Sequence, residues 1–130
     1  IRRHLTERDG WGFTTLECGK NLLSLLDDPQ VDPSGAFLLD SVTALLSNEM
    51  FDERGEFDPD AAKRIREDLT EFAAKTGSTV FVSDYIYSDA CEYSETVEAY
   101  RQGLAAADRA LASVCERVIE ISGGMEEVWK

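Results

Sequence analysis

AFLLDSVTALLSNEMF, residues 36–51, is the stretch from which the fold class is predicted. Its first five residues form a continuous apolar run that ends in Asp40, a pattern typical of a β-strand buried on both faces. Apolar side chains then recur on one helical face from Val42 to Met50, which predicts that a helix follows the strand directly. A strand joined at once to a helix is the repeating unit of an α/β fold.

The same alternation of strands and helices extends along the rest of the chain. The predicted elements are, in order, a short strand at residues 13–17, one or two helical turns at 21–26, a loop at 27–35, the strand and helix of 36–51, a helix from about 58 to 75, a strand at 78–83, a helix from about 94 to 115, a strand at 117–122 and a last strand within 126–129. Asp58 and Pro59 suit the start of the first long helix, as N-cap and first helical residue. Strands that alternate with helices in this way predict a mainly parallel sheet.

The size and charge of the chain limit its function. Its 130 residues, 43% of them hydrophobic, suffice for one domain with a core. No apolar run is long enough for a membrane span, and the chain opens with no signal-peptide pattern. The formal net charge of −13 repels phosphate backbones and anionic lipids, so we expect neither a nucleic-acid partner nor a membrane partner. A nucleotide in a local pocket is compatible with this charge, because magnesium can neutralise its phosphates there.

The cysteines indicate the redox compartment. Cys18, Cys91 and Cys115 lie far apart, with no CxxC pair and no histidine at ligand spacing. This pattern argues against a zinc site, and the odd count argues against a disulfide scaffold. We therefore expect reduced cysteines and a cytoplasmic protein.

Three acidic residues, Glu17, Asp40 and Asp84, lie at or just after the ends of predicted strands. Ligands of open α/β sheets bind beyond the carboxyl ends of the strands, which makes these acids candidates for a binding site. Asp40 is placed as a Walker B carboxylate would be, where it could hold Mg²⁺ beside nucleotide phosphates. The alternative is that Asp40 serves only as the N-cap of a helix that begins at Ser41.

His4 is the one histidine of the chain, and it lies among the cations Arg2, Arg3 and Arg8. Neighbouring cations disfavour the protonated imidazole, which suits a nucleophile that attacks a phosphate. The planar guanidinium of Arg8 could clamp that phosphate. The alternative is a surface or core histidine without a special role. The chain contains no GxxxxGK[ST] phosphate loop.

Six short blocks follow one another along the chain. They are H-x3-R at His4 and Arg8, F-x-T-x-E at Phe13, Thr15 and Glu17, LLD-S-V-T-x-L-L-S-N from Leu38 to Asn48, VFVS from Val80 to Ser83, AYR from Ala99 to Arg101, and ISG from Ile121 to Gly123. Their order resembles the bifunctional adenosylcobinamide kinase / adenosylcobinamide-phosphate guanylyltransferase (CobU) family of cobalamin biosynthesis. The resemblance extends over the whole chain, and its first two blocks are the most specific.

The resemblance implies a three-layer, RecA-like P-loop fold with a mainly parallel sheet. It also implies an enzyme that phosphorylates adenosylcobinamide with ATP or GTP and then transfers GMP from GTP through a guanylylated histidine. The residues it assigns are His4 as the GMP acceptor, Leu5, Thr6, Glu7 and Arg8 as the lining of the GTP site, Glu17 as a nucleotide contact, and Asp40 as a nucleotide contact and the Mg²⁺ ligand. The assembly it implies is a homotrimer.

Family members open with a strand, a glycine-rich phosphate loop and a helix. The resemblance therefore implies that residues 1–130 are the C-terminal three-quarters of a single P-loop-type domain, whose first strand and phosphate loop lie upstream. Two other hypotheses remain open at the level of sequence: a degenerate relative that binds nucleotide or a corrinoid without turnover, and a structural or assembly domain. A GxxxxGK[ST] motif upstream in the gene would favour the enzyme, whereas a gene that begins here would favour the other two.

Overall fold

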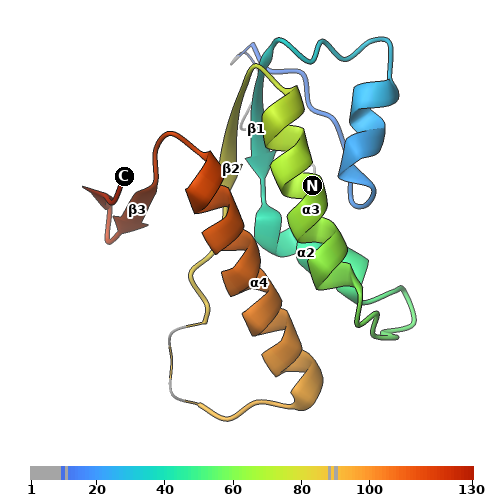
Figure 1. Ribbon diagram of the computed structural model, residues 1–130, viewed down its shortest axis with the longest axis vertical. Helices are drawn as coiled ribbons and strands as arrows, with labels where there is room; N and C mark the ends of the chain where they lie inside the picture. Colours follow the sequence, from blue (N-terminus) through green and yellow to red (C-terminus); the bar gives the residue numbers. More distant parts are fainter. Residues whose placement is uncertain (1–9, 11, 88, 90) are drawn as a thin grey trace.

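A computed structural model describes residue 10, residues 12–87, residue 89 and residues 91–130 of the chain. Its elements are the 3₁₀ helix η1 (Leu22–Asp27), β1 (Ala36–Asp40), α2 (Val42–Met50), α3 (Ala61–Lys75), β2 (Ser78–Val82), α4 (Glu95–Val114), β3 (Ile119–Ser122) and β4 (Met125–Val128), shown in Figure 1. The predicted alternation of strands and helices is confirmed. In the described ranges, no helix is both long and apolar enough to cross a membrane.

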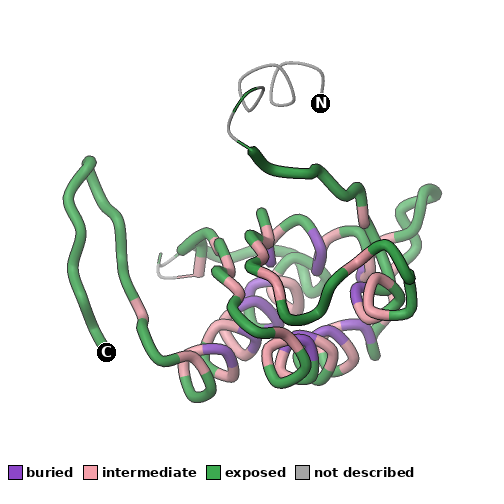
Figure 2. The backbone as a smooth tube through the Cα atoms, turned by 90° about the horizontal axis from the view of Figure 1, so that it is seen from above, coloured by how far each residue is buried: buried purple, intermediate pink, exposed green. Residues whose placement is uncertain are grey.

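The strands form two separate pairs. β1 and β2 are parallel, in a register that runs from Ala36 beside Ser78 to Asp40 beside Val82. β3 and β4 form an antiparallel hairpin that does not join the first pair and extends away from the helices (Figure 2). The strands predicted at residues 117–122 and within 126–129 are thus both present, as β3 and β4, and in the described residues the parallel sheet has two strands.

The core lies between the β1–β2 pair and the helices. Figures 1 and 2 show α3 and α4 on one side of the two strands. Phe72 of α3 packs its ring edge-on against Phe37 of β1, with centroids 5.4 Å apart, and against Phe81 of β2, at 6.4 Å. The buried hydrophobic residues of this core are Leu22, Val42, Leu45, Leu46, Met50, Ala61, Ile65, Leu69, Phe72, Leu104, Ala107 and Leu111.

The opposite face of the β1–β2 pair is exposed, with Leu38 49% and Val80 59% accessible to solvent. The prediction that residues 36–40 form a strand buried on both faces is therefore wrong for the described chain. The physical reason is that its helices pack against one face only, so burial alternates along each strand.

Helix α4 approaches α2 and α3 closely at Gly103. A Cβ atom at this position would lie 2.9 Å from the Cβ of Ala62 and 3.4 Å from the Cε of Met50. Gly103 is buried, and the absence of a side chain lets the three helices share one core.

Two elements differ from the sequence predictions: one predicted strand does not form, and one helix begins later than predicted. Residues 13–17 form no strand, because within the described chain their backbone pairs with no other strand, and Phe13 is 60% exposed. Helix α3 begins at Ala61 rather than near Pro59. The carboxylate of Asp58 accepts a hydrogen bond from the backbone N–H of Asp60 at 2.9 Å, which stabilises a turn before the helix.

Candidate functional site

The carboxyl ends of β1 and β2 place two of the predicted acids at the same edge of the sheet. Asp40 ends β1 opposite Val82, and Asp84 follows Val82 by two residues. The N-cap of α2 is Ser41, whose hydroxyl accepts a hydrogen bond from the N–H of Ala44 at 3.2 Å. The alternative role of Asp40 as N-cap is therefore wrong. Asp40 is exposed, and it lies at the edge where ligands of α/β proteins bind.

Thr43, in the first turn of α2, makes two hydrogen bonds that connect the elements at this edge. Its hydroxyl accepts a hydrogen bond from the backbone N–H of Asp84 at 2.9 Å. Its carbonyl accepts another from the hydroxyl of Tyr100, on α4, at 3.0 Å. One residue thus fixes α2, α4 and the segment after β2 relative to one another.

Asp108 of α4 has a half-buried carboxyl group that holds the segment after β2 through Tyr87. The hydroxyl of Tyr87 donates a hydrogen bond to its Oδ2 atom at 2.9 Å. Burial raises the pKa of Asp108, the hydrogen bond from Tyr87 opposes this rise, and the charge of Asp84 adds to it. The hydroxyl of Ser83 lies close enough to Asp108 to favour its charged form, yet makes no hydrogen bond of good geometry. Burial and the bond to Asp108 raise the pKa of Tyr87, so its hydroxyl keeps its proton.

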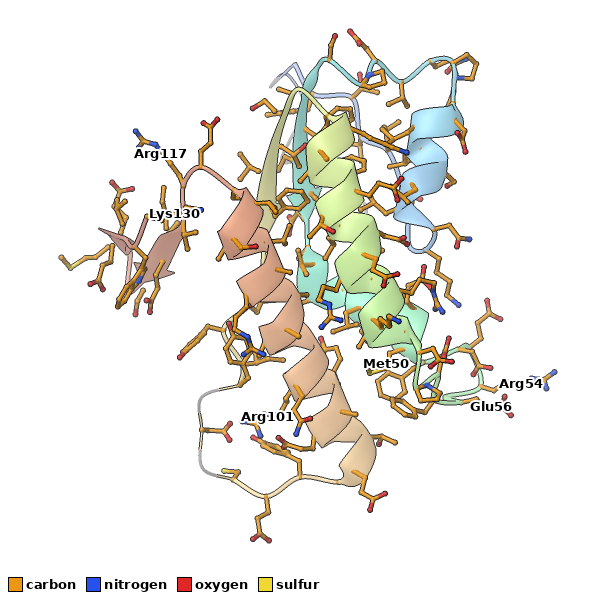
Figure 3. All side chains as sticks on the ribbon, viewed as in Figure 1. Met50, Arg54, Glu56, Arg101, Arg117 and Lys130 are labelled. Atoms are coloured by element: carbon orange, nitrogen blue, oxygen red, sulfur yellow. The ribbon has the colours of Figure 1, made fainter. Side chains whose placement is uncertain are left out.

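Arg101 of α4 is the most buried charged residue among those described, with only 7% of its surface exposed. Its Nη1 donates to Glu98 at 2.9 Å and its Nη2 to the carboxylate of Asp89 at 3.3 Å. Its Nε donates to the carbonyl of Ile86 at 3.4 Å. The guanidinium also lies over the ring of Tyr93, 4.5 Å from the centroid. Figure 3 shows Arg101 between α4 and the segment that leads from β2 into that helix.

Of the other predicted site residues, only Glu17 is among the described residues, and it does not join this cluster. His4, Leu5, Thr6, Glu7 and Arg8 lie outside the described residues. Glu17 is exposed in an irregular segment whose continuation contacts the carboxyl end of α2: the N–H of Asn21 donates to Glu49 at 2.7 Å. Asp40, by contrast, lies next to the amino end of the same helix.

The acids at this edge can be compared with what a metal ion requires. Within the described ranges, no group of three His, Cys, Asp or Glu residues could hold a metal ion. Mg²⁺ does not need such a group, because it is commonly bound by one or two carboxylates, water and the phosphates of a nucleotide. A single exposed carboxylate at a strand end, Asp40, fits that requirement.

Four residues of this edge were not predicted from the sequence as site residues: Thr43, Tyr87, Arg101 and Asp108. One signal could have found the last two. Arg101 and Asp108 are polar residues seven positions apart on an otherwise apolar helical face, which is two turns of helix. Thr43 and Tyr87 form hydrogen bonds to residues that are far away in the sequence, and a local sequence pattern cannot predict such bonds.

A parallel strand pair with acids at its carboxyl edge and helices packed on it places the chain in the α/β class of proteins, compatible with a nucleotide-binding fold. The family model described as cobinamide kinase / cobinamide phosphate guanyltransferase matches residues 1–128, so the chain belongs to this family (CobU). None of the curated proteins compared matches the chain. Membership in the family implies a transferase role in cobalamin biosynthesis, with a nucleotide and cobinamide as substrates.

Proposed function

We propose that this chain is part of an enzyme that phosphorylates adenosylcobinamide and then transfers GMP from GTP to adenosylcobinamide phosphate through a guanylylated His4. The observation that carries the proposal is the family match, which extends over residues 1–128 and so includes His4, Arg8 and Asp40. The position of Asp40 at the carboxyl edge of the β1–β2 pair supports it further.

Transfer through His4 divides one displacement into two. In the first, an imidazole nitrogen attacks the α-phosphorus of GTP, a P–N bond forms, and the bond to pyrophosphate breaks. The imidazole loses its other ring proton to solvent as the phosphoramidate forms. In the second, a phosphate oxygen of adenosylcobinamide phosphate attacks the same phosphorus, the P–N bond breaks, and the imidazole recovers a proton.

The other predicted residues have supporting roles in this proposal. Leu5, Thr6 and Glu7 line the GTP site, and Glu17 contacts the nucleotide. The guanidinium of Arg8 binds the phosphate that His4 attacks. Asp40 would hold Mg²⁺, which supplies positive charge to the phosphates when bound. A homotrimer is part of the proposal, and its mass can be measured by sedimentation equilibrium.

The test uses the full-length gene product with Mg²⁺ and GTP labelled on the α-phosphate. We expect label that stays on the denatured protein, is released by acid, and is lost in His4→Ala. Asp40→Asn should reduce the rate of labelling at least tenfold, because its carboxylate no longer holds the metal ion. Asp32→Asn is the matched control, since Asp32 is an exposed acid in the loop at the opposite end of β1, and it should label like the parent.

Two results would contradict the proposal. Absence of label in a folded parent protein would exclude the covalent step and leave a kinase or a binding relative. Label that persists in His4→Ala would assign the acceptor to another residue.

A further inference from the structure

Residues 18–21 lead from Glu17 into the core, and they are fixed by a hydrogen bond to α2. The backbone N–H of Asn21 donates to the Oε1 atom of Glu49, near the carboxyl end of that helix, at 2.7 Å. Leu22, the next residue, is buried in the core. Within the described part of the chain, residues 12–17 form no hydrogen bond. Asn21 is therefore the first residue after Glu17 that is bonded to a helix.

The backbone of Asn21 has the left-handed conformation that turns the chain into η1. Its φ is 55°, which asparagine tolerates better than most residues do. Its carbonyl accepts hydrogen bonds from the N–H and the hydroxyl of Ser24, at 2.9 Å and 2.6 Å. Just before this turn, a Cβ atom added at Gly19 would lie 3.4 Å from the Nδ2 atom of Asn48, so the segment also passes close to α2. Asn21 is thus held on both sides, by Glu49 through its N–H and by Ser24 through its carbonyl.

Glu49 is enclosed, and each of its two oxygens has a partner. Its side chain is 7% exposed. While Oε1 accepts from Asn21, Oε2 accepts a hydrogen bond from Nη2 of Arg64, on α3, at 3.0 Å. The same nitrogen of Arg64 bonds Asp58 at 3.1 Å. The carboxylate of Glu49 is therefore held by α3 and presents a fixed acceptor to residues 18–21.

Helix α2 connects this contact with the carboxyl edge of the sheet. Asp40 directly precedes the N-cap residue at the amino end of the helix, whereas Glu49 lies close to the carboxyl end. The rise of about 1.5 Å per residue separates these two ends by roughly 10 Å. Glu17 lies four residues before Asn21, a stretch that reaches at most about 14 Å when fully extended. Both predicted nucleotide contacts of the described chain are thus held relative to the same helix.

We propose that Glu49 is a positioning residue for the nucleotide, because it holds residues 18–21 on α2 and thereby keeps Glu17 within reach of a nucleotide bound at Asp40. This inference rests on the proposed function, since it takes Glu17 as a nucleotide contact. Glu49 itself is enclosed, so it acts on the nucleotide only through the segment that it holds.

The test measures binding of α,β-methylene-GTP to the full-length protein by isothermal titration calorimetry, because this analogue cannot transfer GMP. Glu49→Ala should weaken binding about tenfold, since residues 18–21 must then be ordered when the nucleotide binds. Glu49→Gln should restore most of the affinity, because its amide oxygen can still accept the N–H of Asn21. With GTP as substrate, Glu49→Ala should raise the KM for labelling and leave the rate at saturating GTP unchanged.

Asp58→Ala is the matched control. It removes one carboxylate from the same guanidinium of Arg64 and one hydrogen bond from the turn before α3, but it leaves the bond between Asn21 and Glu49 in place. It should bind the analogue within about twofold of the parent, because a partly exposed ion pair contributes little. An equal loss of affinity in Asp58→Ala and Glu49→Ala would mean that Glu49 acts only through general stability, and would overturn the inference.

A double-mutant cycle tests whether Glu49 acts through Glu17. Glu17→Ala should itself weaken binding of the analogue, and in that background Glu49→Ala should cost little more, since the contact that it positions is already gone. Additive losses would overturn the inference. If Glu49→Ala does not fold, Glu49→Asp takes its place, because it keeps the charge beside Arg64 but is one methylene too short for the same bond to Asn21. Binding by Glu49→Asp as tight as that of the parent would then overturn the inference.

The outcomes separate this inference from the proposed function. A parent that binds the analogue but takes no label from GTP would contradict the guanylyl transfer, and the affinities of the variants would still decide the role of Glu49. A parent that takes label while Glu49→Ala binds the analogue as tightly as it does would overturn the inference alone. A folded parent that does not bind the analogue would overturn both.

Discussion

At the scale of single residues, the pair of Tyr87 and Asp108 shows how the candidate site is held. Asp108 is half-buried, and its raised pKa means that folding makes its charged form less favourable. Tyr87 reduces that cost by donating a hydrogen bond to the carboxylate. A carboxyl group with a raised folded pKa adds stability when it is protonated. This contribution is complete below the unfolded pKa of about 3.9 and is lost as the pH rises through the folded value.

We predict from this that Tyr87→Phe destabilises the protein more at pH 7 than at pH 3.5. At pH 7 the charged Asp108 loses its donor, which should cost about 1 kcal/mol at a half-exposed site. At pH 3.5 the carboxyl group is largely neutral and can donate its own proton, so the cost should be smaller. Urea unfolding at both pH values measures the difference.

Tyr93→Phe is the control, because the hydroxyl of Tyr93 bonds the exposed carboxylate of Asp89 in a similar way. That bond lowers the pKa of Asp89 and raises the pKa of Tyr93 to about 12. Both groups are exposed, so this variant should unfold close to the parent at pH 7. An equal cost for the two variants would mean that Asp108 is not desolvated in the folded protein.

At the scale of elements, the close approach of α4 to α2 and α3 depends on Gly103. We predict that Gly103→Ala destabilises the fold by about 1–3 kcal/mol, because the added methyl group overfills a packed core. Alanine favours a helix over glycine by about 1 kcal/mol, so a well-tolerated methyl group would instead stabilise α4. The sign of the change in the free energy of unfolding therefore tests the packing.

The double variant Gly103→Ala, Ala62→Gly identifies the clash. Its new methyl group replaces the one removed from α3, since a Cβ at Gly103 would lie 2.9 Å from that of Ala62. The two changes should therefore couple favourably, and the double variant should be more stable than the sum of the single changes predicts. Additive effects would place the strain elsewhere.

The same elements show what sequence patterns can predict. Apolar runs and helical periodicity correctly located β1, β2, α2 and α4, because burial against a core imposes those patterns locally. They did not predict that Leu38 is exposed. An apolar residue in a strand has the same sequence signal whether or not a helix covers the face on which it lies. Asp40 was found because a strand end is a local feature. The polar position of Arg101 on an apolar helical face is local too, but its partners could not be predicted, because Asp89 and Ile86 lie 12 and 15 positions away in sequence.

At the scale of the whole molecule, negative charge is the dominant feature. The chain has 26 acidic and 13 basic side chains, so repulsion between carboxylates opposes folding over the entire surface. Ion pairs act in the opposite direction at a few points, such as Lys75 with Glu71 at 2.6 Å. Exposed pairs of this kind contribute about 0–1 kcal/mol each.

These two effects respond oppositely to salt, which gives the last prediction. Raising NaCl from about 20 mM to 0.5 M shortens the screening length from roughly 20 Å to about 4 Å, so that repulsion between distant carboxylates is removed before the close ion pairs are fully lost. We expect the Tm at pH 7 to rise by about 3 °C or more, the shift that roughly 1 kcal/mol produces in a domain of this size. Differential scanning calorimetry measures it, and a repeat at pH 5, where fewer carboxylates are charged, should show a smaller rise. A fall in Tm with salt at pH 7 would mean that ion pairs such as those of Arg64 and Arg101 outweigh the net charge.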